Sequence, residues 1–211
     1  KSKIGWDHPI VTSGEYEGFN NASMEHFGDS LKGFAREMTQ NSLDAAINSD
    51  QPVVINLKLH DVAISDIPNV EELKNNFQMG LDTSIGMETN PDPKVIDFYS
   101  NAIDLLEKDS LKVFEFSDFN TTGMSSGGDK MLDDTFYVYM KTKDFSQKPD
   151  GSLGSFGIGK SAPYAVSNLR TLITSSVYSL NGVATQATQG KSILTTLRVS
   201  NKDGSHTFKN S

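Results

Sequence analysis

Residues 36–45 read Arg-Glu-Met-Thr-Gln-Asn-Ser-Leu-Asp-Ala, and this stretch decides the fold that the sequence predicts. Glu37, Asn41 and Asp44 are spaced i, i+4 and i+7, so a helix places all three on roughly one face. Apolar residues around them predict a helix over residues 31–49 that packs into a core. Burying such polar groups is costly unless partners satisfy them, as a metal ion with a phosphate would. The alternative is the exposed polar stripe of an ordinary amphipathic helix.

A second segment, residues 111–124, is a β-prone run that ends in an acidic turn. Its apolar residues predict a strand up to Asp118, and a turn-rich loop with Gly123 follows. A carboxylate at a strand end, followed by a flexible loop, is well placed to contact a ligand. The alternative role of Asp118 is to cap the turn.

A third segment, residues 151–161, reads Gly-Ser-Leu-Gly-Ser-Phe-Gly-Ile-Gly-Lys-Ser. Its glycines let the backbone approach a phosphate closely and turn amides toward it. Residues 154–161 also fit the P-loop pattern G-x-x-x-x-G-K-[ST]. A P-loop needs a buried strand directly before it, whereas residues 144–150 are typical of a loop. The P-loop and a glycine-rich turn without any ligand stay open as alternatives.

Taken in order, the three segments resemble the ATP-binding domain of the gyrase, heat-shock chaperone, histidine kinase and mismatch-repair (GHKL) superfamily. Residues 37–45 look like its first box, residues 118–124 like its adenine box, and residues 154–159 like its phosphate lid and second glycine box. The resemblance covers roughly residues 30–176. It implies binding of ATP and Mg²⁺.

Two further features refine the resemblance. Arg36 and the strand-like residues 169–176 are similar to the chaperone branch. The adenine box departs from the usual Asp-x-Gly-x-Gly pattern, because Asn120 stands at the first glycine position and one residue is inserted before Gly123. Histidine kinases usually carry a second amide where this chain has Glu37. The resemblance therefore implies an ATPase of the chaperone, mismatch-repair or microrchidia-like type.

The fold that the resemblance implies is an α/β, two-layer sandwich of the Bergerat type. It has a mixed, largely antiparallel sheet with helices on one face. We expect a single domain over residues 1–211, with an N-terminal arm over 1–30 and an ATP lid over 124–157. The family's late Gly-Thr-x-Ile strand has no clear counterpart, since Thr195 and Thr196 are poor substitutes. We expect a C-terminal truncation or an insertion, and a downstream domain of a larger chain.

The resemblance also implies residue roles. Glu37 is the expected general base that activates water for ATP hydrolysis, and Asn41 the expected Mg²⁺ ligand. Asp118 is expected to accept a hydrogen bond from the adenine amine. The other expected nucleotide contacts come from Asp44, Gly123, Met124, Gly154, Gly157, Ile158, Gly159, Lys160 and Thr174.

Each role has a structural alternative. Glu37 and Lys160 are alternatively solvated surface side chains. Asp44 alternatively makes a structural hydrogen bond, and Met124 alternatively fills the core. At the level of the whole chain, the alternatives to an ATPase are a nucleotide-binding module without turnover and an interaction domain whose glycine segment is only a loop.

Composition narrows the remaining classes. The 211 residues have a net charge of −8, no cysteine and 36% hydrophobic residues. Attraction of the whole surface to nucleic acid is therefore unexpected, although other domains of a larger protein leave it open. The sequence has no apolar run of about 18 residues, which predicts no membrane span. No signal peptide is visible. The absence of cysteine leaves the cytoplasm as the expected compartment. The resemblance implies a homodimer when ATP binds. The four histidines have no metal-ligand spacing.

Hydrophobic periodicity sets the expected order of the elements. Helices are expected near residues 31–49, 70–77, 95–108 and 133–143. Strands are expected at 53–59, up to 118, and at 169–178, 182–188 and 192–199, with the start of a hairpin at 201–211.

Overall fold

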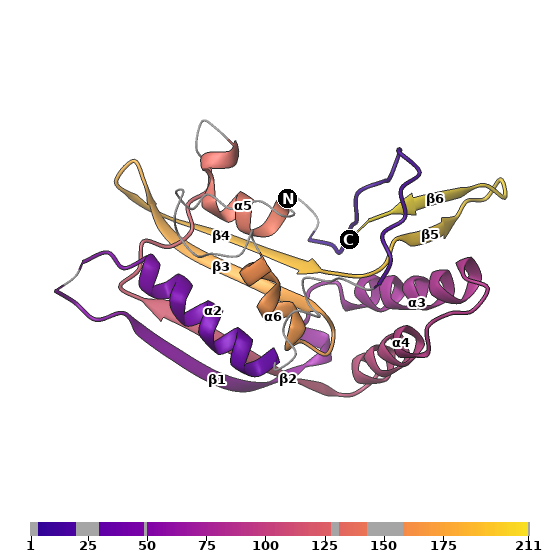
Figure 1. The fold of residues 1–211 in the computed structure, drawn as a ribbon, viewed down its shortest axis with the longest axis horizontal. Helices are drawn as coiled ribbons and strands as arrows, with labels where there is room; N and C mark the ends of the chain where they lie inside the picture. The colour runs from indigo at the N-terminus through magenta and orange to yellow at the C-terminus, as the bar shows by residue number, and fades with distance from the viewer. Residues whose placement is uncertain (1–3, 20–29, 49, 128–130, 143–157, 211) are drawn as a thin grey trace.

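The computed structural model describes residues 4–19, 30–48, 50–127, 131–142 and 158–210. Within them the chain is a mixture of helices and strands (Figure 1). The helices are α2 Ser30–Asp44, α3 Val70–Met87, α4 Pro93–Leu106, α5 Thr135–Lys141 and α6 Ala162–Ala165. The strands are β1 Val54–Ala63, β2 Ser110–Phe119, β3 Thr171–Leu180, β4 Val183–Ser192, β5 Leu197–Ser200 and β6 His206–Lys209. Short 3₁₀ turns are η1 Ile64–Asp66, η2 Met131–Asp133 and η3 Ile158–Ser161.

The strands form three antiparallel pairs, β1–β2, β3–β4 and β5–β6. The expected mixture of helices with antiparallel strands is confirmed, while the two-layer sandwich stays a prediction. The β3–β4 hairpin turns at Asn181 and Gly182, whose φ angles are 51° and 80°. Positive φ at both central residues is the requirement of the tight hairpin turn that Asn-Gly favours.

Helix α2 lies on the β1–β2 pair (Figure 1). The buried ring of Phe34 packs against Phe114 at 5.6 Å and Phe116 at 5.8 Å between centroids. These aromatic contacts fix which face of the helix meets the sheet. The helix ends at Asp44, earlier than the expected residue 49, because the following residues pair with the loop after β2.

Helices α3 and α4 pack together and hold much of the core. Phe77, Tyr99 and Leu106 are completely buried there. Gly80 of α3 faces the Tyr99 ring, and a Cβ at that position would overlap it. The glycine therefore lets the two helices approach closely, which offsets its low helix propensity.

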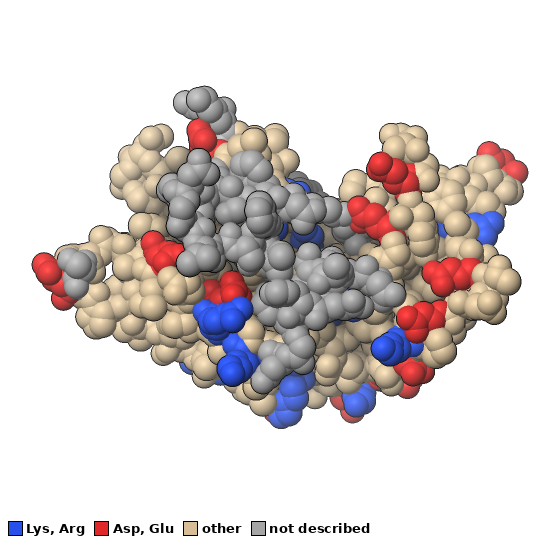
Figure 2. Space-filling model, in the orientation of Figure 1, with Lys and Arg blue, Asp and Glu red and all other residues tan. Residues whose placement is uncertain are grey.

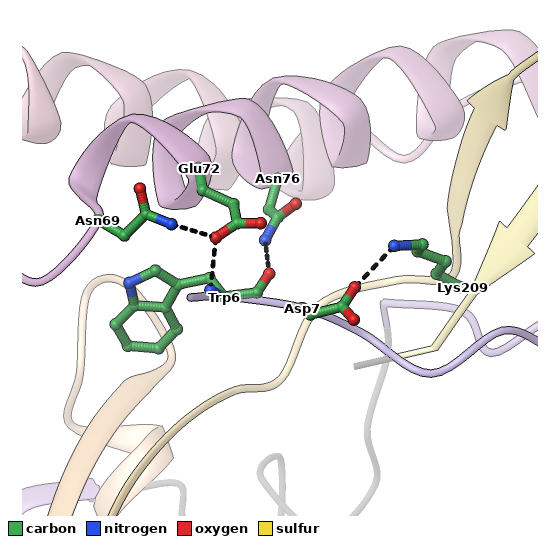
Figure 3. A network of polar contacts seen from close by, with 6 residues as sticks. All are labelled: Trp6, Asp7, Asn69, Glu72, Asn76 and Lys209. Atoms are coloured by element: carbon green, nitrogen blue, oxygen red, sulfur yellow. Dashed lines mark hydrogen bonds and ion pairs between the residues drawn. The ribbon is translucent and has the colours of Figure 1, made fainter. Parts of the chain in front are cut away.

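The N-terminal arm is fastened to α3 and β6 (Figure 3). The Trp6 N–H donates to Glu72 Oε2 at 2.8 Å, and Asn76 Nδ2 donates to the Trp6 carbonyl at 2.7 Å. Asp7 pairs with Lys209 at 2.7 Å. The expected arm is therefore an ordered part of the fold over its described residues.

The indole of Trp6 also contacts the β3–β4 hairpin. A Cβ at Gly190 of β4 would lie 2.8 Å from the Trp6 ring. The indole N–H donates to the Pro68 carbonyl at 2.7 Å. Trp6 thus joins the arm to both α3 and β4.

Lowering the pH below about 6.5 is expected to destabilise the fold through His8. This side chain is buried, and its Nε2 has no hydrogen-bond partner in the described part of the chain. Burial, and then the charge of Lys209, lower the pKa of His8 below its usual value, while Asp7 and Glu72 act weakly in the opposite sense. The unfolded chain therefore binds the proton more readily, and stability is lost as the pH falls through the folded pKa.

Urea unfolding at several pH values between 5 and 7 measures this effect. The variant His8→Gln cannot take up the proton, so its unfolding free energy is expected to change less over that range. Equal pH dependence in both proteins would contradict the assignment.

Candidate functional site

Helix α2 presents the first predicted motif. Glu37 is half-buried, with 23% of its side chain exposed, whereas Asn41 and Asp44 are exposed. The Arg36 guanidinium lies 2.9 Å from Glu37 Oε1. Asp44 Oδ1 accepts a hydrogen bond from Gln40 at 2.6 Å. The polar line therefore lies along the border of the packed face, with only Glu37 partly enclosed.

The end of β2 brings the second motif onto α2. Asp118 Oδ2 lies 2.7 Å from the hydroxyl of Ser42, a residue that is only 2% exposed. The hydroxyl is also 3.0 Å from the Met38 carbonyl, but the carboxylate is the closer and charged acceptor. Asp118 Oδ1 accepts from Thr121 at 3.2 Å. Each carboxylate oxygen accepts more than one hydrogen bond, so Asp118 retains capacity for a ligand amine.

The loop after Asp118 is tied to the residues that follow α2. The Thr122 N–H donates to the Ala45 carbonyl at 2.9 Å, and the Ile47 N–H donates to the Asn120 carbonyl at 3.1 Å. Asn120 has a φ of 61°. Asparagine is among the residues that adopt this left-handed conformation most readily after glycine. The departure from the family pattern at this position therefore has a conformational explanation.

The second motif continues onto β3. The Met124 N–H donates to the Ser176 hydroxyl at 2.7 Å. A Cβ at Gly123 would overlap the Val177 carbonyl. Thr174 lies two residues before Ser176 on β3, so both side chains point to the same face of the hairpin. Gly123, Met124 and Thr174 are thus gathered at one edge.

Replacing Gly123 with alanine is expected to lower the free energy of unfolding by about 3 kcal/mol. Its φ of 68° disfavours any L side chain, and the added methyl group meets backbone of β3. Gly182→Ala is the matched control, because Gly182 has a φ of 80° but no atom within 4 Å of the added Cβ. Chemical denaturation measures both. Equal losses would show that the contact with β3 adds nothing.

The described end of the third motif meets the first. Ile158, Gly159 and Lys160 belong to the turn η3. A Cβ at Gly159 would overlap Glu37 Oε2, so the glycine allows the backbone to lie directly on the carboxylate. Lys160 Nζ lies 2.5 Å from the Thr142 carbonyl. The predicted contacts at Gly154 and Gly157 lie outside the described residues.

The predicted lid is anchored where the structure describes it. Asp134 begins helix α5 and accepts hydrogen bonds from the N–H groups of Gly127, at 2.9 Å, and Tyr137, at 2.8 Å. Burial by itself would raise the pKa of Asp134, but these hydrogen bonds, together with those from Ser126 and the Phe136 N–H, hold it below its usual value. Phe136 and Met140 of α5 are buried. The described part of the predicted lid is therefore held through α5.

Two residues of this region escaped the sequence analysis, Ser42 and Ser176. Ser42 follows Met38 by four residues and so lies on the packed side of α2. A serine on the apolar face of a predicted helix is the signal that marks it. Ser176 carries no comparable signal, because its partner Met124 lies on a loop 52 residues away.

Two cavities lie elsewhere. One of about 860 Å³ lies between α4 and the segment from Tyr164 to Arg170, and another of about 440 Å³ lies beside Trp6 and Lys209. None of the predicted site residues that the structure describes lines either cavity. In this structure Gly159 rests on Glu37, so a ligand between them has to displace the glycine segment.

The remaining observations describe the protein further but assign no role to a residue. Over the described ranges, no group of three or more acidic, histidine or cysteine side chains is arranged to hold a metal ion. Within the same ranges, none of the helices combines the length and apolarity needed to cross a membrane. On the face drawn in Figure 2, lysine and arginine side chains are interspersed with acidic ones. Comparisons with protein-family models, curated proteins and solved structures give no match to this chain.

Proposed function

We propose that this chain is an ATP-binding domain of the GHKL type that hydrolyses ATP with Mg²⁺. The observation that carries the proposal is that the second and third segments, which are distant in sequence, both contact helix α2, which carries the first. Gly159 lies on Glu37, and Asp118 is hydrogen-bonded to Ser42. The loop after Asp118 then continues to Ser176 on β3. A nucleotide site of this type requires the three segments to lie together. A glycine segment that was only a surface loop would not need to contact the other two.

The donor set suits Mg²⁺ with a phosphate. Asn41 provides an amide oxygen on the exposed side of α2, one turn after Glu37. Mg²⁺ usually retains several waters and takes few protein ligands together with phosphate oxygens. One protein oxygen, one helical turn from the Glu37 that Gly159 contacts, fits that pattern, so Asn41 is the proposed ligand.

Glu37 is the proposed general base for hydrolysis. Hydrolysis requires a water in line with the terminal phosphate, and a carboxylate that orients and deprotonates it. Glu37 is partly enclosed and lies against the glycine segment that would cover the phosphates. Of the three motif residues Glu37, Asn41 and Asp44, it alone has that position.

The adenine end is proposed at Asp118. Its carboxylate accepts the exocyclic amine, while Gly123, Met124 and Thr174 border the base. The exposed position of Asp118 at a strand end leaves it accessible to a base. The proposed binding face therefore runs from Glu37 to the β3 side of the domain.

Nucleotide binding is proposed to act as a switch. ATP has to displace Gly159 from Glu37, and the segment then closes over the phosphates. In this proposal the movement drives homodimerisation and is passed to a downstream domain of a larger, cytoplasmic protein. The complete fold is proposed to be the two-layer Bergerat sandwich, to which the three antiparallel pairs would contribute.

A second candidate is a nucleotide-binding module without turnover. One observation favours it: both oxygens of Glu37 have neighbours, Arg36 at Oε1 and Gly159 at Oε2. A base held in that way has no place for water until the glycine segment moves. If the segment never clears it, ATP binds without hydrolysis.

The P-loop alternative gains no support from the described residues. The helix after residues 154–161 has four residues, Ala162–Ala165, and the described strands pair only in antiparallel fashion. P-loop sites use a strand of a parallel sheet followed by a helix. Lys160 contacts the Thr142 carbonyl instead.

Titration calorimetry with ATP, in the presence and absence of Mg²⁺, tests the proposal. Binding that strengthens with Mg²⁺ is expected for the unmodified chain, and Asn41→Ala is expected to lose that dependence. Asn101→Ala is the matched control, because it removes an exposed amide from α4, away from the proposed site. Failure of the unmodified chain to bind any adenine nucleotide would refute the proposed function.

A further inference from the structure

The ammonium groups of Lys160 and Lys191, two lysines that are distant in sequence, lie at the C-terminal end of α5. Lys160 Nζ lies 2.5 Å from the carbonyl oxygen of Thr142, the C-cap residue. Lys191 Nζ lies 2.9 Å from the carbonyl oxygen of Met140. The two carbonyls belong to residues two apart in the chain, Met140 in the last turn of α5 and Thr142 at its C-cap. Both ammonium groups therefore lie at the same end of α5.

Lys191 also lies on the same face of the β3–β4 hairpin as the proposed adenine contacts. It pairs with Leu172, two residues before Thr174. Opposite residues of an antiparallel pair share a face, and so do alternate residues of one strand. Lys191 therefore projects on the side of Thr174 and Ser176. Along β3 these positions run from Ser176, which contacts Met124, to Leu172, which lies opposite Lys191.

We propose that Lys191 is a phosphate-binding residue of the nucleotide site, acting beside Lys160. This inference rests on the proposed ATP-binding function and adds a residue from β4 to it. The carbonyls at the end of a helix carry partial negative charge and hold both lysines in the nucleotide-free chain. A phosphate oxygen is a charged and therefore stronger acceptor. The triphosphate thus takes over both ammonium groups from α5.

The competing explanation is purely structural. Lysines near the end of a helix also serve as caps for its last carbonyls. A cap needs only a hydrogen-bond donor, whereas a phosphate contact of this kind needs the positive charge. Glutamine at position 191 retains a donor for the Met140 carbonyl and removes the charge, so it separates the two roles.

The test compares ATP and adenosine binding to the full chain by titration calorimetry. Lys191→Gln is expected to weaken ATP binding about tenfold, because a charge-assisted contact is lost. Its affinity for adenosine, which has no phosphate, is expected to stay within about twofold of the unmodified chain. Lys141→Gln is the matched control, since Lys141 is an exposed lysine of the same helix. Lys191→Arg keeps the charge and is expected to bind ATP within about threefold of the unmodified chain.

Three results would overturn the inference. One is unchanged ATP affinity in Lys191→Gln, another is an equal loss of ATP and adenosine, and the third is an arginine variant as weak as the glutamine variant. Each of these presupposes that the unmodified chain binds ATP. An unmodified chain that binds no ATP refutes the proposed function itself, which keeps the two failures distinguishable.

Discussion

Replacing Glu37 with glutamine is expected to slow ATP hydrolysis by at least about 100-fold while leaving ATP affinity within about threefold. General-base catalysis contributes roughly 10²- to 10⁴-fold, and glutamine cannot take a proton from water. Binding is retained because the base acts on water and not on the nucleotide. Steady-state phosphate release and calorimetric titration of the same preparation measure the two effects.

The matched control for Glu37 is Asp97→Asn, which removes a carboxylate from the exposed surface of α4. It is expected to hydrolyse ATP like the unmodified chain. If Glu37→Gln hydrolyses ATP at the unmodified rate, the general-base role is wrong. If neither protein hydrolyses ATP but both bind it, the module without turnover is the better description.

Replacing Asp118 with alanine is expected to weaken ATP binding about ten- to a hundredfold. A hydrogen bond to a charged group contributes about 1.5–3 kcal/mol, which corresponds to that range. The unmodified chain is also expected to prefer ATP to GTP, because guanine has a carbonyl acceptor at the position where adenine has the amine proposed to donate to Asp118. Competition between the two nucleotides for a fluorescent ATP analogue measures affinity and preference together.

The control for Asp118 lies on the same sheet. Asp61 is an exposed carboxylate of β1 that pairs with Lys112 at 2.6 Å, toward the opposite end of the strands. Asp61→Ala is expected to leave nucleotide binding unchanged. Equal binding of ATP and GTP by the unmodified chain would show that the adenine assignment is wrong.

The sequence predicted the helices and strands well where apolar residues recur with a clear periodicity. The helix at α4 and the strands at β1 and β2 match the residues whose spacing indicated them. Helix α3 extends beyond the expected residues 70–77. The expectation was too short because Gly80, Thr83 and Ser84 look unfavourable in a helix. The structure buries these small residues, and Thr83 accepts a hydrogen bond from the Arg198 N–H at 2.9 Å. Tertiary contacts therefore override the local preference.

The sequence predicted only those residues of the candidate site that belong to its three motifs. The motifs indicated that residues 37–45, 118–124 and 154–159 belong together, and the structure joins the first to the described part of each of the others. The supporting residues were not predictable, because their partners lie far away in sequence. Lys191 depends on a pairing register and on a helix end 51 residues earlier.

The docking of the N-terminal arm gives this chain a built-in optical probe. Trp6 is the sole tryptophan of the sequence, and it lies where the arm, α3 and β4 meet. Its emission therefore reports a single place in the molecule. Gly190 beside the indole pairs with Ile173, the neighbour of Thr174 on β3. A ligand that shifts this hairpin against α3 alters the surroundings of the ring, so its arrival becomes visible as a change in intrinsic fluorescence without any attached dye.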